Sequence, residues 1–249
     1  FTANAAAGNG GAIAAKKGIT LTMSSTLLGN NLLSTSAGLA SHRGAGLYVE
    51  GVLVANALTV VNNKCKTDRT GGGGIAVRSA ADSLSVIRSS YFSNNGCEYG
   101  GDVIIEGGTL YVNGAQFNGV SENTWHQIAA MDTGAGIFED CLFLNNEQSN
   151  LDTILANGGS LSFDFSEETT LNITKITITN GRVQASTPIN TENLYVQGGI
   201  IELSNTRKQK ALTVSQTALF SGQSSSYVAG FELFSLNQMQ VDQGLTLFI

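Results

Sequence analysis

The chain has 249 residues, of which 30 are glycine and only 13% are charged, and its formal net charge is −6 at pH 7. This charge and the lack of a basic stripe argue against a nucleic-acid partner. No apolar run approaches the roughly 18 residues of a membrane span, and the Leu/Glu/Lys/Ala-rich stripes of helical solenoids are missing.

An internal repeat runs along the sequence. In each copy a bulky apolar residue stands three positions before a site that is most often asparagine, and a glycine-rich cluster follows. The apolar members lie 25 to 42 residues apart and are Phe1, Leu28, Val60, Phe92, Phe117, Phe143, Ile178 and Phe220. The asparagines are Asn4, Asn31, Asn63, Asn95 and Asn146.

Short apolar or alternating segments rich in β-branched residues predict strands of three to six residues. In chain order they are 19–23, 46–49, 52–54, 84–87, 103–105, 109–112, 171–174, 176–179, 200–203 and 212–214. Each strand would pair in parallel with its counterpart one repeat away. The pattern predicts an all-β fold, a single-stranded parallel β-helix (solenoid) of about eight coils. The apolar members would stack inward about 4.8 Å apart, and the asparagine amides would bond one another in a turn.

Two pairs of motifs resemble a known family. Phe1-Thr-Ala-Asn4 with Gly10-Gly11-Ala12-Ile13, and Phe92-Ser-Asn-Asn95 with Gly100-Gly101, resemble the FxxN and GGAI motifs of the polymorphic outer-membrane proteins of chlamydiae. Phe143-Leu-Asn-Asn146 is a third FxxN motif, and the resemblance runs over nearly the whole chain. It implies a right-handed β-helix that is exported to the cell surface and acts in adhesion.

The sequence reads as a single domain over residues 1–249, because each coil of a solenoid contacts only its neighbours and no linker interrupts the pattern. Neither end carries the polar cap of a terminal coil. We therefore expect this domain to be a fragment of a longer chain.

Two of the three cysteines fall on the repeat. Cys65 and Cys97 each occupy the second position after the ladder asparagine in adjacent copies, so they would be stacked neighbours. Their separation of about 4.8 Å is within the Cα range of a disulfide. Both a disulfide, which secretion would favour, and two stacked thiols remain open. Cys141 has no counterpart and is interpreted as a buried small hydrophobe.

Enzymes on β-helices commonly use carboxylates on an exposed strand face. The candidates here are Asp102 with Glu106, Glu139 with Asp140, and Asp164 with Glu167 and Glu168, and none has a basic partner nearby in sequence. His42 and His126 lack a second histidine at metal-ligand spacing. We interpret these groups as solvated faces, and predict no catalytic residue, metal site or cofactor.

Trp125 and His126 lie in an insertion after Val120, and insertions on solenoids often form the contact surface. They are the candidate partner loop, although Trp125 could instead fold back over the coil. We predict a non-catalytic, extracellular or cell-surface segment for adhesion or assembly. Its partner would be a protein or glycan on a cell surface, or neighbouring segments of the same assembly. The alternatives are a polysaccharide-binding or polysaccharide-cleaving, pectin-lyase-like module and a structural subunit of a larger complex.

Overall fold

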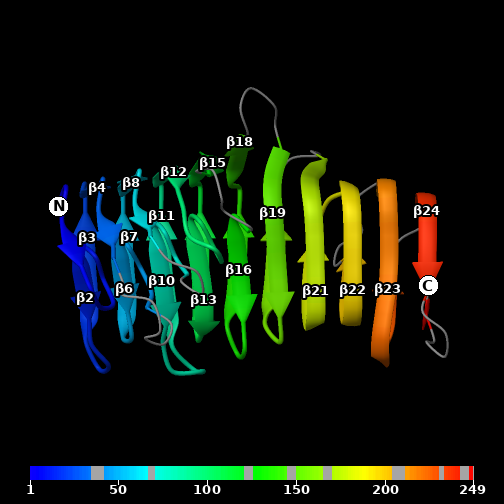
Figure 1. Ribbon diagram of the computed structural model, residues 1–249, viewed down its shortest axis with the longest axis horizontal. Helices are drawn as coiled ribbons and strands as arrows, with labels where there is room; N and C mark the ends of the chain where they lie inside the picture. The colour runs from blue at the N-terminus through cyan, green and yellow to red at the C-terminus, as the bar shows by residue number, and fades with distance from the viewer. Residues whose placement is uncertain are drawn as a thin grey trace.

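The computed structural model describes residues 1–34, 42–66, 71–120, 126–144, 150–164, 170–203, 211–229, 233–241 and 247–248. Within these ranges the regular structure is entirely β-strand, and the paired strands run parallel. The strands stand side by side along one axis, with the chain termini at opposite ends (Figure 1). The predicted all-β parallel solenoid is confirmed. No helix in the described ranges is long and apolar enough to cross a membrane.

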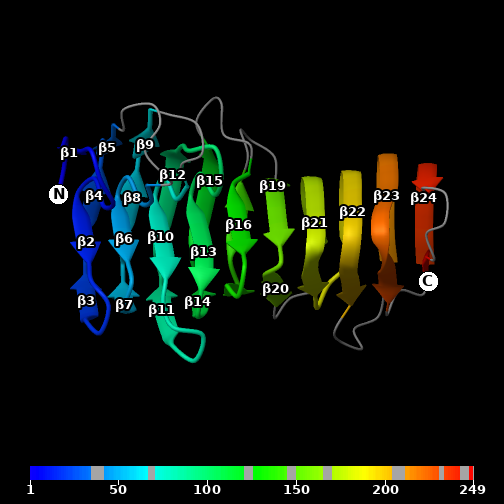
Figure 2. The same ribbon diagram turned by 60° about the horizontal axis from the view of Figure 1, so that its bottom comes forward.

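In the part of the chain that the structure describes, the first side of the coil, sheet 1, holds ten stacked strands, where about eight coils were expected. They are β2 (Ile13–Ala15), β6 (Leu47–Val49), β10 (Ile75–Arg78), β13 (Val103–Gly107), β16 (Ile128–Met131), β19 (Asn150–Asn157), β21 (Leu171–Ala185), β22 (Ile189–Leu203), β23 (Ala211–Ala229) and β24 (Leu233–Val241). The long strands β21 to β23 bend and continue into the second side (Figure 2).

The second side, sheet 2, is continuous with those long strands. Its separate members are β3 (Thr20–Ser24), β7 (Val52–Asn56), β11 (Leu84–Arg88), β14 (Thr109–Asn113), β17 (Ala135–Glu139) and β20 (Ser160–Asp164), with β25 (Leu247–Phe248) paired to β23. Sheet 3 closes the coil with β4 (Leu27–Gly29), β8 (Thr59–Val61), β12 (Tyr91–Asn95), β15 (Gln116–Val120) and β18 (Leu142–Leu144). A short ladder beyond sheet 3 is formed by β1 (Ala5–Ala6), β5 (Leu32–Leu33) and β9 (Lys64–Cys65).

Sheet 3 carries the apolar column that the repeat predicts. Leu28, Val60, Phe92, Phe117 and Phe143 lie in register, one per winding, and all five are buried. The ring centroids of Phe92 and Phe117 are 4.7 Å apart and those of Phe117 and Phe143 are 5.1 Å apart, with nearly parallel planes. Buried aromatic side chains bring large apolar areas out of water, so this column is a main source of stability.

Phe1 continues this column at the first winding, because Thr2 pairs with Gly29. Phe1 is nevertheless 61% exposed. A rung at the end of a stack has a neighbour on one side only, so the same motif buries less surface there.

Ile178 and Phe220 do not belong to the sheet 3 column, and that part of the prediction is wrong. Ile178 pairs with Ala156 and Val196, and Val196 pairs with Phe220, so both lie in sheet 1. Both side chains are buried, so their inward orientation was predicted correctly. The reason for the error is that any inward-facing apolar position followed by a turn can imitate the motif.

The glycine clusters also divide between two corners. Gly11, Gly44, Gly73 and Gly101 precede sheet 1, whereas Gly134, Gly159 and Gly199 lie at the bend between sheets 1 and 2. Glycine serves any corner at which the backbone must adopt positive φ or lie close to another chain segment. Counting glycine clusters therefore overestimates how regular the repeat is.

The windings become shorter toward the C-terminus. Ile176 of β21 pairs with Leu194 of β22, 18 residues later in the chain. Within β21 the buried apolar residues come in three pairs, which are Leu171 with Ile173, Ile176 with Ile178, and Val183 with Ala185. One bend lies at Asn180, whose φ of 51° is in the left-handed region that asparagine tolerates. A coil of this length can thus present three short inward-facing sides.

Candidate functional site

A ladder of asparagine side chains runs inside the corner next to sheet 3. Asn4 donates an Nδ2 hydrogen bond to Oδ1 of Asn31 (2.9 Å), Asn31 donates to Asn63 (2.8 Å), and Asn63 donates to Asn95 (2.9 Å). Each acceptor Oδ1 also receives the backbone N–H of the residue that precedes it in the ladder. The buried amides are thus paired, as buried polar groups must be. Asn146 lies outside the described residues.

The ladder ends on a buried carboxyl group. In the next winding Val120 occupies the position in register with Asn95, and valine offers no side-chain acceptor. Oδ1 of Asp102 accepts the hydrogen bond from Asn95 Nδ2 (2.9 Å) instead, and Oδ2 accepts one from Nε2 of Gln127 (2.8 Å). Burial raises the pKa of Asp102 to about 7, although the two amide donors favour the charged form. Asp102 is therefore a part of the interior and not a surface acid.

Sequence reasoning missed this role of Asp102. In the preceding winding the equivalent position is Gly74, where a Cβ atom would lie 3.4 Å from Nδ2 of Asn95. A side chain at this position therefore points at the ladder. A usable signal lies in the comparison of these two windings. Asp102 stands where the preceding winding has Gly74, and Val120 stands where the preceding winding has Asn95.

Cys65 and Cys97 form a disulfide between adjacent windings, with their Cα atoms 4.9 Å apart. Of the two open interpretations, the structure has the oxidised one. Cys141 is free and buried, and burial raises the pKa of its thiol to about 12. A thiol that stays protonated is a poor nucleophile.

The second residue of the candidate partner loop, His126, is buried. It is 8% exposed, and its ring lies parallel to that of Tyr99 with the centroids 5.8 Å apart. Burial, with a smaller contribution from the Lys175 cation, lowers the pKa of His126 to about 4. His126 therefore does not provide an exposed contact. Trp125 lies outside the described residues, so its role as an anchor stays a prediction.

Tyr99 packs beside a second, smaller apolar cluster on the outer side of sheet 1. Its members form one column, one per winding, and are Tyr48, Ala76, Ile104, Ala129 and Leu155. The column faces away from the coil interior, because the residues on either side of it in each strand belong to the main core. Sheet 1 is thus buried on both faces along these five windings.

Glu106 has a basic partner that the sequence did not reveal. Arg43 Nε lies 2.7 Å from Glu106 Oε1, 63 residues away in the chain, and the two side chains are 11% and 10% exposed. Gly71 lies in register between Arg43 and Tyr99, and a Cβ atom there would come 3.3 Å from Cδ of Arg43. Glu106 is therefore held in an ion pair and does not form a catalytic pair with Asp102.

Two of the remaining acidic candidates, Glu139 and Asp164, lie on the outer face of sheet 2. Glu139 and Asp164 are in register on β17 and β20, and Glu139 Oε2 accepts a hydrogen bond from Asn113 Nδ2 (2.9 Å). Asp140 follows in a turn with φ of 48°, and Glu167 and Glu168 lie outside the described residues. Within the described ranges no group of three or more His, Cys, Asp or Glu side chains could hold a metal ion.

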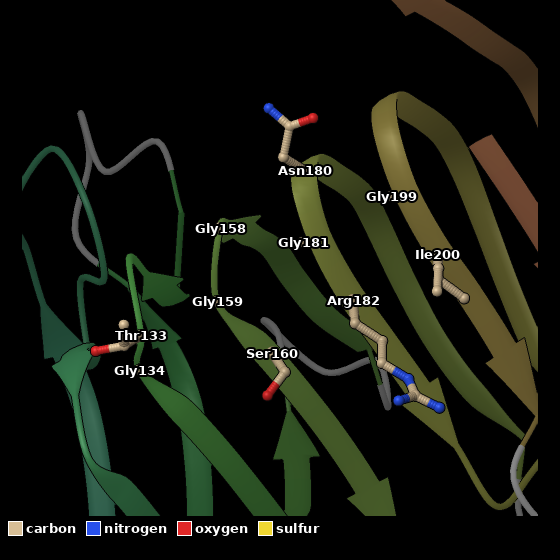
Figure 3. A pocket seen from close by; sticks show the side chains of 10 residues that line it. All are labelled: Thr133, Gly134, Gly158, Gly159, Ser160, Asn180, Gly181, Arg182, Gly199 and Ile200. Atoms are coloured by element: carbon tan, nitrogen blue, oxygen red, sulfur yellow. The ribbon is translucent and has the colours of Figure 1, made fainter. Parts of the chain in front are cut away.

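A surface groove of about 480 Å³ follows the bend between sheets 1 and 2 across four windings. This corner groove is lined by Thr133, Gly134, Gly158, Gly159, Ser160, Asn180, Gly181, Arg182, Gly199 and Ile200. Ser160, Arg182 and Ile200 lie in register on successive strands, and their side chains project from that side of the molecule (Figure 3).

Glycines form the floor of the corner groove because there is no room for a side chain. A Cβ atom on Gly159 would lie 2.7 Å from the carbonyl oxygen of Gly134, and one on Gly181 would lie 2.5 Å from that of Ala156. The polar groups of the walls are hydroxyls, an amide and the guanidinium of Arg182, which is paired with Glu202. None of the described residues that line the groove carries a carboxylate. These groups can donate and accept hydrogen bonds, but they do not supply the acid and base of a hydrolytic site.

No protein-family model, curated protein or solved structure matched the chain.

Proposed function

We propose that the chain is a non-catalytic β-helical segment of an extracellular or cell-surface protein and acts in adhesion or assembly. The observation that carries this proposal is the corner groove, which spans four windings and whose described lining offers hydrogen-bonding groups and no carboxylate. An elongated groove of this kind suits an extended partner, a glycan or a stretch of protein chain, held by several modest contacts.

The location outside the cell is supported by the disulfide between Cys65 and Cys97. Disulfides persist in oxidising compartments and are rare in reducing ones. The resemblance of the FxxN and GGAI motifs to those of chlamydial surface proteins points the same way.

The test is a binding screen with soluble probes, which are polygalacturonate, heparin, chitin fragments and mucin, each with and without calcium. We expect the chain to retain at least one probe and to release no shortened product from it. Arg182→Ala should reduce binding about fivefold or more, because Arg182 is the charged donor of the corner groove.

Arg78→Ala is the matched control, because Arg78 is an exposed arginine of β10 outside the groove lining. Calcium-dependent release of shortened polygalacturonate would favour the polysaccharide-cleaving alternative. If Arg182→Ala and Arg78→Ala bound every probe as the unchanged chain does, the groove would not be the binding surface.

A further inference from the structure

The outer face of sheet 2 carries apolar side chains that lie outside both buried clusters of the described residues. They are Val54 on β7, Leu84 and Val86 on β11, Tyr111 on β14 and Ile137 on β17. Leu84 is 53% exposed and Val54 is 37% exposed, and the other three are half-buried. Contiguous apolar residues on a flat sheet face are typical of a surface that meets a partner.

A row of polar residues runs beside this apolar patch, one residue per winding. In order they are Asn56, Arg88, Asn113, Glu139 and Asp164. Arg88 is exposed, and its guanidinium is in no ion pair within the described ranges. A positive charge therefore lies one winding before Asn113, and a negative charge lies one winding after it.

This order of charges is self-complementary. A two-fold axis parallel to β14, above Asn113, would bring a second copy of the chain face to face with the first. The rotation reverses the order in which the windings follow one another. It does not shift residues along the strand direction, so each residue faces one at the same height in its strand. Arg88 of each copy then lies opposite Glu139 of the other, so the dimer contains two such opposite-charge pairs.

The apolar residues of the three central windings match under the same rotation. Tyr111 lies on the axis and meets Tyr111 of the other copy, while Val86 lies opposite Ile137. The large Leu84 lies opposite the small Ala135, which leaves room for it. The same axis places Val54 opposite Ser162, at the edge of the contact. A single axis therefore satisfies the charges and the side-chain sizes of the three central windings.

We infer that the outer face of sheet 2 joins two copies of this chain in an antiparallel, two-fold symmetric dimer centred on Tyr111 and Asn113. This inference rests on the assembly branch of the proposed function and names its partner. Five windings about 4.8 Å apart and strands of five residues at about 3.3 Å each give a contact of roughly 20 by 15 Å. This is smaller than a standard interface, so a weak dimer with a dissociation constant in the micromolar range is expected.

The test is sedimentation velocity at concentrations from about 1 to about 300 μM, which bracket a micromolar dissociation constant. We expect a monomer–dimer equilibrium for the unchanged chain. Arg88→Glu and Glu139→Arg should each weaken association about tenfold or more, because each creates two like-charge pairs per dimer. The double variant Arg88→Glu/Glu139→Arg should associate within about threefold of the unchanged chain, because it restores opposite charges at the same positions.

Arg78→Glu is the control for net charge, since Arg78 is an exposed arginine of the same winding on a different sheet. It should leave the dimer intact. A chain that stays monomeric throughout the concentration range overturns the inference, as does a dimer that Arg88→Glu and Glu139→Arg leave unchanged. The probe-binding screen of the corner groove is a separate measurement, so the failure of one proposal can be told from the failure of the other.

Discussion

The windings up to β18 and those from β21 onward close the same parallel coil in two ways. The N-terminal windings have three separate sheets, with a Phe column in sheet 3 and an amide ladder beside it. The C-terminal windings are as short as 18 residues and consist of long bent strands that carry paired apolar residues. Long windings therefore have room for residues that recur and stack, whereas short windings depend on backbone pairing and aliphatic packing.

The largest effect should come from removing one ring of the Phe column. Phe117→Ala should reduce the free energy of unfolding by about 4 kcal/mol, because it opens a cavity and removes the stacking on Phe92 and Phe143. Phe220→Ala in the C-terminal region removes the same side chain from the position in register with Val196. It should cost about 3 kcal/mol, because Phe220 is buried without an aromatic neighbour in the described residues.

Hydrogen exchange of the strand amides is the suitable measurement, because a solenoid can open one region at a time. Protection should fall in β12 and β15 for Phe117→Ala and in β22 and β23 for Phe220→Ala. If both variants lost protection equally in all strands, the N-terminal and C-terminal windings would unfold as one unit. They would then not be separate regions of stability.

The next effect should come from the disulfide, which only the N-terminal region has among the described residues. Reduction by dithiothreitol should lower stability by about 3.7 kcal/mol, as expected for two cysteines that are 32 residues apart in the chain. The loss of protection should appear in β5, β9 and β12 and spare β22 and β23. Cys141→Ala is the control. Because Cys141 is not in the disulfide, this variant should lose the same protection on reduction as the unchanged chain.

The same comparison explains what the sequence could predict. Phe92, Phe117, Asn63 and Asn95 were placed correctly because identical residue types recur and stack on one another in adjacent windings. Ile178 was misplaced because the short windings carry aliphatic residues on all three sides. There the spacing of single apolar residues no longer identifies a side of the coil.

The interior polar contacts could not be predicted from local sequence. Arg43 meets Glu106 across 63 residues, and Gln127 meets Asp102 across 25 residues. Each contact depends on which windings lie next to each other and on the loop lengths between them. The corner groove was missed for a related reason, because its polar wall residues come from separate windings and share no motif.

The smallest of the three effects concerns pH. The folded-state pKa of Asp102 is about 7, above its ordinary value near 4, so folding favours the protonated form. Its contribution to stability is therefore complete below about pH 4 and is lost as the pH rises to about 7. Between pH 5.5 and 7 the loss amounts to about 2 kcal/mol, since one pKa unit corresponds to 1.36 kcal/mol.

His126 acts in the opposite direction over an overlapping range. Its folded-state pKa of about 4 lies below its ordinary value, so its contribution is present above about pH 6.5 and is lost as the pH falls toward 4. The two groups largely cancel between about pH 4 and 6.5. The stability of the unchanged chain should accordingly vary little in that interval.

Asp102→Asn separates the two groups. The variant keeps an acceptor for Asn95, and the amide of Gln127 can reverse to accept from the new side chain. Its stability relative to the unchanged chain should rise by about 2 kcal/mol from pH 5.5 to 7, measured by urea unfolding. Asp82→Asn, at an exposed turn, should show no such change. A pH-independent difference for Asp102→Asn would mean that the carboxyl is already ionised at pH 5.5. The amide ladder would then end on an ionised Asp102 carboxylate, which the hydrogen bonds from Asn95 and Gln127 would be sufficient to stabilise.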